Sequence, residues 1–436
     1  MRRPMGSGRA GGGRVRRGTA VSAALLLAVT TAAACGGRDD GDGGTATGEC
    51  KGQQTTGITD TSVKLGATYA LSGPASAYGA IPKGIKAYFD YVNAEKNGID
   101  GRKVEYLVRD DGYQPPKTVE EVRRLVEQEQ VFALFQTLGT PPTMATWDYA
   151  NQQKVPQIFV ATGASAFGAD DKHPWTIGWQ PNYVSEARVY AQNLKQNKPK
   201  AKVAVLFQND DYGDDLLGGF KKAIEGTEIK IVQEESYEVT DPSVEAQMRD
   251  LAGSGADVFL NIATPKFASQ ALAADAKITD WNPMHIVNNV SASVTVLKPV
   301  GFDNVQGVVS ATYYKDPNDP QWADDAEMKL YKEKMKQYAP GNDPNVPYHA
   351  FGWAVATAFH KTLEAAECKT REGLRDAMRN LKGVEVPMLL PGITMNTGPD
   401  DGFPLESMQM MEFKGERWEL TGEVIDTRKE FGPVGH

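Results

Sequence analysis

The sequence is poor in the side chains that most catalytic sites require. Its 436 residues include five histidines and three cysteines, and neither type shows the spacing of a metal site. It contains no G-x-x-x-x-G-K-[ST] phosphate loop, and no predicted strand is followed by G-x-G-x-x-G. Gly163-Ala-Ser165-Ala-Phe167 lacks the last glycine of a serine-nucleophile turn. We therefore expect a binding protein that is not an enzyme and that holds no cofactor or metal.

Positive charge is scarce outside the N-terminus. The formal net charge is −9, and the first 34 residues hold six arginines without any acidic residue, so the remainder is more acidic still. Such a chain lacks the basic face with which proteins bind nucleic acid. We therefore expect no nucleic-acid partner.

The sequence also lacks long apolar runs, and even the apolar run near the N-terminus is short. Val21–Val29 follows a basic start and cannot cross a bilayer, which is typical of an export signal. Small residues follow it, so residues 1–34 are predicted to be a signal peptide. Cys35 directly after them is typical of a bacterial lipoprotein, although the Ala-x-Ala sequence before it also suits cleavage that releases an unlipidated protein. Residues 35–57 are then a lipidated Gly- and Asp-rich tether, and the protein is extracytoplasmic and anchored to the cell membrane.

After residue 60 the apolar pattern alternates between strands and helices. The first series predicts strands at 63–69, 103–108, 131–135 and 157–160 and helices at 85–96, 118–129 and 142–153. The second predicts strands at 202–207, 229–234, 257–262 and 285–289 and helices at 212–224, 243–252 and 266–275. Helices at 321–338, 348–366 and 370–381 follow, and then β-hairpins within 385–424. This order predicts an α/β fold with two doubly wound, Rossmann-like lobes joined by a hinge.

The two lobes suggest where a ligand binds. We assign residues 58–180 and 315–383 to lobe 1, and residues 181–314 and 384–430 to lobe 2. Ligands of open α/β sheets bind beyond the carboxyl ends of the strands, and a ligand of two such lobes sits between them. We therefore expect the functional residues in the loops that follow strands.

The loops of lobe 1 carry small, hydroxyl-bearing and aromatic residues. Gly139 and Thr140 stand before a proline-initiated helix, where free N–H groups suit a carboxylate. Val160 and Thr162 border the turn after the fourth strand, and Tyr78 follows the first strand. There are alternatives to ligand binding. Helix capping accounts equally well for either turn taken by itself, and Tyr78 can be a tyrosine that only packs in the core.

Polar loops also follow the strands of lobe 2. They contain Tyr212, Thr264 and Asn289, which become candidates for the same ligand site. An acidic cluster at residues 210, 211, 214 and 215 is interpreted as favouring a helix N-terminus rather than binding calcium.

Two cysteines remain after Cys35. Cys50 lies just before the first predicted strand, and Cys368 follows a long predicted helix. Outside the cytoplasm such a pair can form one disulfide, which would pin the tether to the folded part if these two ends adjoin. Two independent thiols are the alternative.

Two motifs carry a resemblance to a known family. They are Ser72-Gly73-Pro74 followed by Tyr78-Gly79, and Asp211-Tyr212-Gly213 after a strand. Through them the chain resembles, over residues 61–425, the type I solute-binding proteins of ABC importers, in the leucine/isoleucine/valine-binding group. The resemblance implies two lobes that close on a ligand, with Gly139, Thr140 and Thr162 contacting its carboxylate and Val160 nearby. It also implies that Tyr78 and Tyr212 border the side-chain pocket.

The chain departs from the amino-acid-binding pattern in lobe 2. Members that bind amino acids usually place a glutamate there to pair with the ammonium, and the matching residue here is Asn289. A tyrosine of the pattern is replaced at Thr264 or Pro265. An amide does not neutralise an ammonium, so the charge-assisted bond is lost. The ligand is therefore a neutral or branched-chain amino acid, an aromatic or other organic acid with an uncharged tail, or a different compound such as an amide.

The resemblance also implies a function and a partner. It suggests a lipid-anchored protein that captures a small carboxylate and delivers it to the permease subunits of an ABC importer. We expect a monomer. A ligand-sensing module of the same fold, acting through a partner protein, is the alternative.

Overall fold

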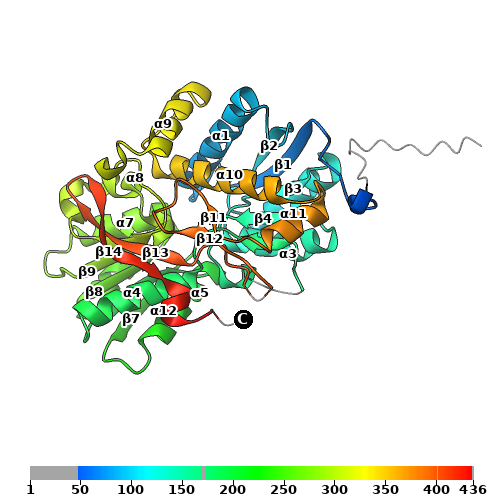
Figure 1. The fold of residues 1–436 in the computed structure, drawn as a ribbon. Coiled ribbons are helices and arrows are strands. Elements are labelled where there is room, and N and C mark those ends of the chain that lie inside the picture. The colour runs from blue at the N-terminus through cyan, green and yellow to red at the C-terminus, as the bar shows by residue number, and fades with distance from the viewer. Residues whose placement is uncertain (1–47, 169–171, 400, 435–436) are drawn as a thin grey trace, which may run out of the picture. The chain divides into compact units, whose positions relative to one another are not determined.

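The computed structural model describes residues 48–168, 172–399 and 401–434 (Figure 1). All of them belong to one compact unit, Gly41–His436. The predicted signal peptide (residues 1–34), Cys35 and residues 36–47 of the predicted tether lie outside the described residues.

The first sheet has five parallel strands in the order β2-β1-β3-β4-β5. They are β1 (Ser62–Tyr69), β2 (Lys103–Asp110), β3 (Ala133–Phe135), β4 (Gln157–Val160) and β5 (Thr176–Gly178). Helices cover both faces. On one face α1 (Ile81–Glu95) packs against α10 (Pro347–Ala365), which also contacts α11 (Arg371–Met378), and α9 (Ala326–Tyr338) contacts α1. On the other face α2 (Pro115–Arg123) packs against α3 (Thr140–Gln152). We call this sheet and its helices lobe 1.

The second sheet has seven strands in the order β14-β13-β10-β9-β8-β6-β7. They are β6 (Lys202–Gln208), β7 (Lys230–Tyr237), β8 (Val258–Ile262), β9 (Met284–Val287), β10 (Val309–Thr312), β13 (Ser407–Lys414) and β14 (Arg417–Asp426). The first five are parallel, whereas β13 and β14 form an antiparallel hairpin beside β10. The helices are α4 (Tyr183–Asn197), α5 (Asp211–Ile224), α6 (Glu245–Ala252), α7 (Pro265–Asp275), α8 (Val294–Leu297) and α12 (Thr427–Phe431). This sheet and these helices form lobe 2.

The described chain passes between the lobes through residues 179–182, 313–325 and 379–406. The third connection contains the small hairpin of β11 (Val384–Glu385) and β12 (Thr394–Met395). Two doubly wound lobes joined by a hinge were predicted from the sequence, and this fold class is confirmed.

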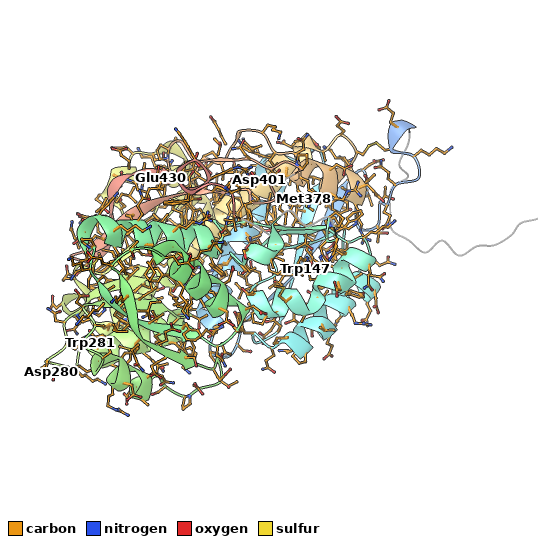
Figure 2. All side chains as sticks on the ribbon, turned by 90° about the horizontal axis from the view of Figure 1, so that it is seen from below. Trp147, Asp280, Trp281, Met378, Asp401 and Glu430 are labelled. Atoms are coloured by element: carbon orange, nitrogen blue, oxygen red, sulfur yellow. A yellow bond between two sulfur atoms is a disulfide. The ribbon has the colours of Figure 1, made fainter. Side chains whose placement is uncertain are left out.

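Two glycines bring α10 close to α1. A Cβ atom added at Gly84 would lie 2.0 Å from the carbonyl oxygen of His349, and one added at Gly352 would lie 2.2 Å from that of Ile81. Any side chain at either position would therefore push the helices apart. Side chains fill the space between each sheet and its helices (Figure 2). The close approach of α1 and α10 at these two glycines sets the position of the N-terminal part of α10, which carries Tyr348 and Phe351.

Some elements differ from the prediction. The strands β5 and β10 were not predicted, because strands of three or four residues show too little periodicity to recognise. The helix α4 was not predicted either, although it has 15 residues. The predicted helix 321–338 is shorter: a 3-10 turn, Pro320–Trp322, comes first, and the side chain of Asp325 then accepts a hydrogen bond from Met328 N as the cap of α9. None of the helices in the described part of the chain combines the length and hydropathy that crossing a bilayer requires.

Cys50 and Cys368 form a disulfide bond. It joins the start of the described chain to the turn between α10 and α11 in lobe 1. Hydrogen bonds continue the attachment, because Gln54 O accepts from Arg371 N at 2.9 Å and Gln54 N donates to Glu372 Oε2 at 2.8 Å. The Arg371 guanidinium donates in turn to the carbonyl oxygens of residues 131 and 132 before β3.

Candidate functional site

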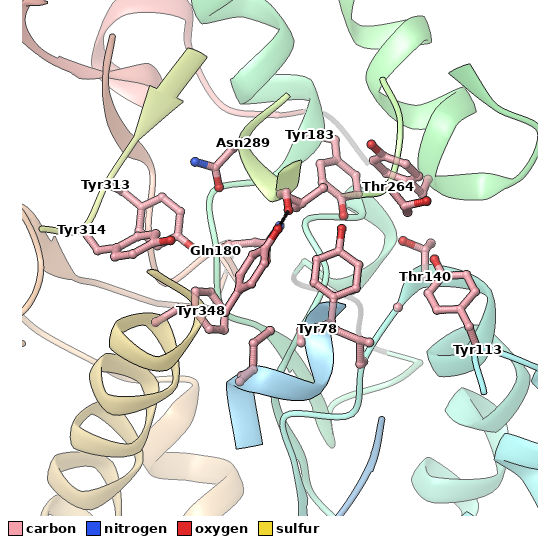
Figure 3. Close-up of a pocket in the computed structure, with 17 residues that line it drawn as sticks. Tyr78, Tyr113, Thr140, Gln180, Tyr183, Thr264, Asn289, Tyr313, Tyr314 and Tyr348 are labelled. Carbon is pink, nitrogen blue, oxygen red and sulfur yellow. Dashed lines mark hydrogen bonds between the residues drawn. The ribbon is translucent and has the colours of Figure 1, made fainter. Parts of the chain in front are cut away.

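A cavity between the two lobes is lined by 17 residues (Figure 3). The space between their side chains, including the part open to solvent, amounts to about 580 Å³. Lobe 1 contributes Tyr78, Ile81, Tyr113, Leu138, Gly139, Thr140, Ala161, Tyr348 and Phe351; lobe 2 contributes Tyr183, Tyr212, Thr264, Asn289 and Val290; the connections contribute Gln180, Tyr313 and Tyr314.

The wall of this cavity carries no ionised group. Among the described residues that line it, none is Asp, Glu, Lys, Arg or His. Burial raises the pKa values of Tyr78, Tyr113, Tyr212 and Tyr348 well above the usual value, so these phenols stay neutral. Neutral phenols both donate and accept hydrogen bonds. The cavity therefore offers apolar rings and neutral polar atoms, but no counter-ion.

One end of the cavity is built on the N-terminus of α3. The N–H of Thr140 lies in the first turn, where no carbonyl of the helix can accept from it, and the helix dipole favours negative charge there. The Thr140 hydroxyl lies 2.6 Å from that of Thr162, which holds it in place. Gly139 has φ 94° and ψ 148°, a conformation that favours glycine, and a Cβ atom there would lie 2.5 Å from the ring of Tyr113. This end can bind a carboxylate.

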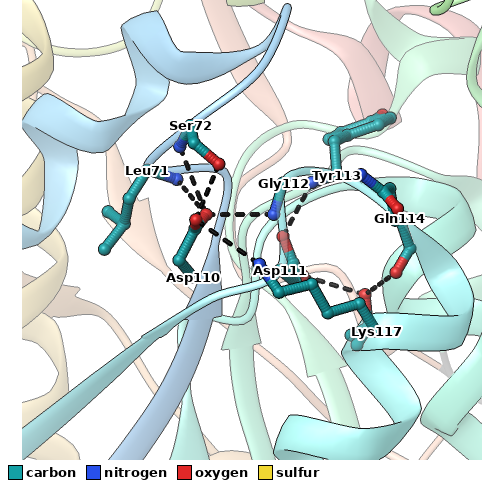
Figure 4. A network of polar contacts seen from close by, with 9 residues as sticks. Leu71, Ser72, Asp110, Asp111, Gly112, Tyr113, Gln114 and Lys117 are labelled. Atoms are coloured by element: carbon teal, nitrogen blue, oxygen red, sulfur yellow. Dashed lines mark hydrogen bonds and ion pairs between the residues drawn. The ribbon is translucent and has the colours of Figure 1, made fainter.

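Tyr113 reaches the cavity from an unusual turn after β2 (Figure 4). Its φ of 62° is rare for a residue with a bulky side chain. Asp111 stabilises the turn, because its carboxylate accepts from Tyr113 N at 2.9 Å and from the Thr118 hydroxyl at 2.9 Å. These two hydrogen bonds stabilise the strained backbone of Tyr113, and this backbone conformation places the tyrosine ring against Gly139.

The neighbouring Asp110 ties this turn to the loop after β1 (Figure 4). Its carboxylate accepts from Leu71 N at 2.9 Å, from the Ser72 hydroxyl at 2.6 Å and from Gly112 N at 3.0 Å. Partial burial alone would raise the pKa of Asp110, but these hydrogen bonds outweigh burial and lower it to about 2. The loops that lead to Tyr78 and Tyr113 are therefore fixed to each other.

In lobe 2, Thr264 belongs to a buried polar group. Its hydroxyl donates to Gln208 Oε1 at 3.1 Å, and its N–H donates to the Tyr237 hydroxyl at 2.9 Å. The same Tyr237 hydroxyl donates to Gln208 Oε1 at 3.0 Å. Thr264 is thereby held in one orientation at the cavity wall.

The lobes are also bonded directly to each other beside the cavity. Asp215 of α5 accepts from the N–H and from the hydroxyl of Ser165, each at 2.7 Å, across the gap between the lobes. The Tyr348 hydroxyl of lobe 1 donates to Val290 O of lobe 2 at 3.0 Å. Within the acidic cluster, Asp210, Asp211 and Asp214 lie at the N-terminus of α5, as predicted for the cluster, whereas Asp215 connects the lobes.

We predict that Asp215→Asn weakens ligand binding about 10-fold. The asparagine amide loses the charge-assisted hydrogen bonds that Asp215 accepts from Ser165. The conformation in which the lobes touch is then less stable, so a ligand that binds this conformation binds more weakly. Titration calorimetry measures the affinity. Asp214→Asn is the matched control, since Asp214 lies exposed on the same helix. Equal affinities for the two variants would contradict a role for the Asp215 contact.

Glu186 lies buried directly behind Asn289. Its carboxyl accepts from Asn289 N at 2.6 Å and from the Tyr190 hydroxyl at 2.7 Å, and the residue is 1% exposed. Burial raises the pKa of Glu186 to about 7, although these two hydrogen bonds oppose the shift. Below about pH 4 the Glu186 carboxyl is protonated in both the folded and the unfolded protein. Between about pH 4 and 7 it stays protonated only in the folded protein. Stability contributed at this site therefore falls as the pH rises through that window.

We predict that Glu186→Gln becomes more favourable relative to wild type as the pH increases. The difference in free energy of unfolding between the two proteins should shift by roughly 3 kcal/mol toward the variant between pH 4 and pH 8. Urea unfolding at several pH values measures it, and any constant cost of the amide cancels in the comparison. A difference that does not change with pH would show that Glu186 titrates normally.

The structure brings most of the predicted site residues together. Tyr78, Gly139, Thr140, Tyr212, Thr264 and Asn289 line the cavity. Val160 does not, because it lies fully buried inside β4, and Ala161 just beyond the strand lines the cavity in its place. Thr162 also lies behind the wall: its hydroxyl contacts that of Thr140 and accepts from Ala164 N at 3.1 Å. Thr162 therefore supports Thr140 from behind the cavity wall.

Several lining residues were missed by the sequence analysis. They are Ile81, Tyr113, Leu138, Ala161, Gln180, Tyr183, Val290, Tyr313, Tyr314, Tyr348 and Phe351. Most of them lie in the connections, in the unpredicted helix α4 or at the start of α10. The paired tyrosines 313 and 314 and the Asp-Asp-Gly-Tyr turn at residues 110–113 are signals in the sequence that could have drawn attention to two of these places.

Comparison with known proteins identifies relatives of this chain. A family profile described as "Periplasmic binding protein" matches residues 62–417. The Leu/Ile/Val-binding protein homolog 7 of Brucella suis biovar 1 (strain 1330) is 25% identical over 208 residues, which are 45% of this chain and 51% of that protein. The chain thus matches about half the length of this curated relative.

Solved structures share the fold. A branched-chain amino acid ABC transporter protein from Thermus thermophilus with bound valine has a TM-score of 0.75 at 18% identity, covering 85% of this chain and 99% of that one. A fatty acid ABC transporter substrate-binding protein from Thermomonospora curvata has a TM-score of 0.74 at 24% identity, covering 88% of this chain and 97% of that one. At these identities the likeness shows the fold alone, and the two descriptions name different ligands.

Proposed function

Because the chain belongs to the periplasmic binding protein family, a family of solute-binding proteins and not of enzymes, we propose that it is an extracytoplasmic receptor that captures a small carboxylate with an uncharged tail. The observation that carries this proposal is the cavity between the lobes, which has a helix N-terminus at one end and a neutral wall of tyrosines elsewhere. The N–H of Thr140, from which no carbonyl of the helix can accept, and the Thr140 hydroxyl, which Thr162 holds in place, suit a carboxylate. The aromatic and aliphatic lining suits the tail.

The neutral wall favours an acid without an ammonium group over an amino acid. An ammonium would lose its hydration in the cavity and find no carboxylate at the wall, since Asn289 lines it and Glu186 behind is buried, with its pKa raised to about 7. The carboxylate of either kind of ligand meets the same N-terminus of α3. We therefore rank aromatic and other organic acids above branched-chain amino acids.

The delivery of the ligand is part of the proposal. The Brucella suis relative is named a Leu/Ile/Val-binding protein homolog, and both solved structures belong to ABC transporters. We propose that this protein likewise serves the permease subunits of an ABC importer. Acylation of Cys35 would keep it at the membrane.

Matched pairs of ligands test the proposal. Leucine and 4-methylpentanoate share one tail, as do phenylalanine and 3-phenylpropanoate, and the members of each pair differ by the ammonium group. A ligand that binds the folded state raises the melting temperature by mass action, so thermal shifts of the purified protein report binding. We expect the acids to give larger shifts than their amino acids. Binding of leucine at micromolar concentration with no response to either acid would refute the ranking, and no response to any carboxylate would refute the receptor proposal.

A further inference from the structure

The cavity has a second polar end that a simple monocarboxylic acid would leave unpaired. In Figure 3, Gln180 and Asn289 lie toward the end marked by Tyr313 and Tyr314, whereas Thr140 lies at the opposite end. Gln180, Tyr313 and Tyr314 stand in the connections between the lobes, so this end lies at the hinge. We call it the hinge end.

Gln180 supplies an unused hydrogen-bond donor at the hinge end. The residue is 6% exposed and lines the cavity. Its Nε2 atom is buried and has no hydrogen-bond partner among the described residues. Buried side-chain amides are rarely left unpaired in native proteins, because the unmade bond costs stability. A donor kept unpaired at a cavity wall indicates a partner that arrives with the ligand.

Asn289 supplies an acceptor at the same end. Its Nδ2 donates to Ala311 O, and its backbone N–H donates to Glu186 Oε1 at 2.6 Å, so two bonds fix the residue from the side of lobe 2. No described residue donates a hydrogen bond to its Oδ1 atom. The hinge end therefore presents one donor and one acceptor, each held on a different part of the fold.

We propose that the ligand carries, at the end remote from its carboxylate, an uncharged group that both accepts and donates hydrogen bonds, such as a hydroxyl or a carboxamide, which pairs with Gln180 and Asn289. This inference rests on the proposed binding of a carboxylate at Thr140. The group is uncharged because the described residues that line the cavity offer no counter-ion to a second carboxylate or to an ammonium. A site with a buried donor discriminates strongly against an analogue that leaves this donor unpaired.

Acids that differ only in the remote group test the inference. The probes are 3-(4-hydroxyphenyl)propanoate against 3-(4-methylphenyl)propanoate, and 4-hydroxybenzoate against 4-methylbenzoate for a shorter ligand. Titration calorimetry with the purified protein should show the hydroxy acid of at least one pair binding about 10-fold or more tightly than its methyl isostere. Equal or tighter binding of both methyl acids would overturn the inference and leave the proposed function standing. Absence of binding by all four acids would overturn the inference, whereas only the absence of binding by every carboxylate, leucine and 4-methylpentanoate included, would overturn the proposed function.

Two variants separate recognition from a structural role. Gln180→Met keeps the length of the side chain and removes its polar atoms, so it should abolish the preference, and the hydroxy acid and the methyl acid should then bind with similar affinities. Gln196→Met is the matched control, because it makes the same exchange at an exposed glutamine of α4 that does not line the cavity, and it should keep the preference. Gln180→Met should also not lower the melting temperature of the ligand-free protein. A fall of several degrees, or a preference that survives in Gln180→Met, would overturn the inference.

Discussion

Replacing Gly139 with alanine is expected to weaken ligand binding about 100-fold. Alanine would have to adopt φ 94° and ψ 148°, where a side chain is strained by about 1–3 kcal/mol, and its Cβ atom would lie 2.5 Å from the ring of Tyr113. Relief of either conflict moves the N-terminus of α3 or the tyrosine, and both are parts of the carboxylate end. A loss of 2.7 kcal/mol corresponds to about 100-fold in affinity. Titration with the acid that gives the largest thermal shift measures the change.

Gly218→Ala is the matched control for this substitution. Gly218 lies exposed in α5, and a Cβ atom there meets nothing within 4 Å. Alanine should leave binding unchanged and slightly stabilise the helix. Wild-type affinity in Gly139→Ala would show that the ligand does not depend on the N-terminus of α3, and the carboxylate end would then have to lie elsewhere.

Loss of the disulfide is expected to lower the free energy of unfolding by about 2–5 kcal/mol. The bond joins Cys50 to Cys368 across a sequence separation of 318 residues, so it closes a very long loop of the unfolded chain. Without it, the hydrogen bonds of Gln54 with Arg371 and Glu372 and of Gln53 with Thr370 would still hold the start of the described chain. Urea unfolding of the Cys50→Ser, Cys368→Ser double variant measures the effect.

Reduction of the wild-type protein provides an independent check. Unfolding of wild type in a reducing agent should show the same loss as the double variant, and the agent should not change the variant further. Ligand affinity should be unaffected in both cases, because the bond lies at the far end of α10 from Tyr348. A loss below about 0.5 kcal/mol would show that the N-terminal attachment contributes little to global stability.

The sequence was most informative where local pattern and tertiary position coincide. In parallel sheets the carboxyl ends of strands share one edge, so Gly139, Thr140 and Tyr212 could be placed at the site from strand positions alone. The same reasoning could not decide which residue after β4 faces the cavity. Val160 and Ala161 are adjacent, and the exact end of a strand depends on its neighbours, here β3 and β5.

The residues at the hinge end could not be predicted from the local pattern of the sequence. Tyr313 and Tyr314 reach the cavity because β10 pairs with β13, which lies far away in the sequence, and the chain then crosses to lobe 1. Tyr113 depends on a positive φ that Asp111 stabilises through two hydrogen bonds. In both cases the decisive contacts are tertiary, and a single sequence does not display them.

The placement of Gln180, Tyr313 and Tyr314 in the connections between the lobes has a kinetic consequence. Atoms close to the axis of a rotation move little, whereas atoms far from it travel a long way. The hinge end should therefore keep nearly the same geometry whether the lobes stand apart or together, while the bond from Asp215 to Ser165 exists only when they meet. We expect a solute to be accepted or rejected at the hinge within its first encounter, before closure commits the protein to it.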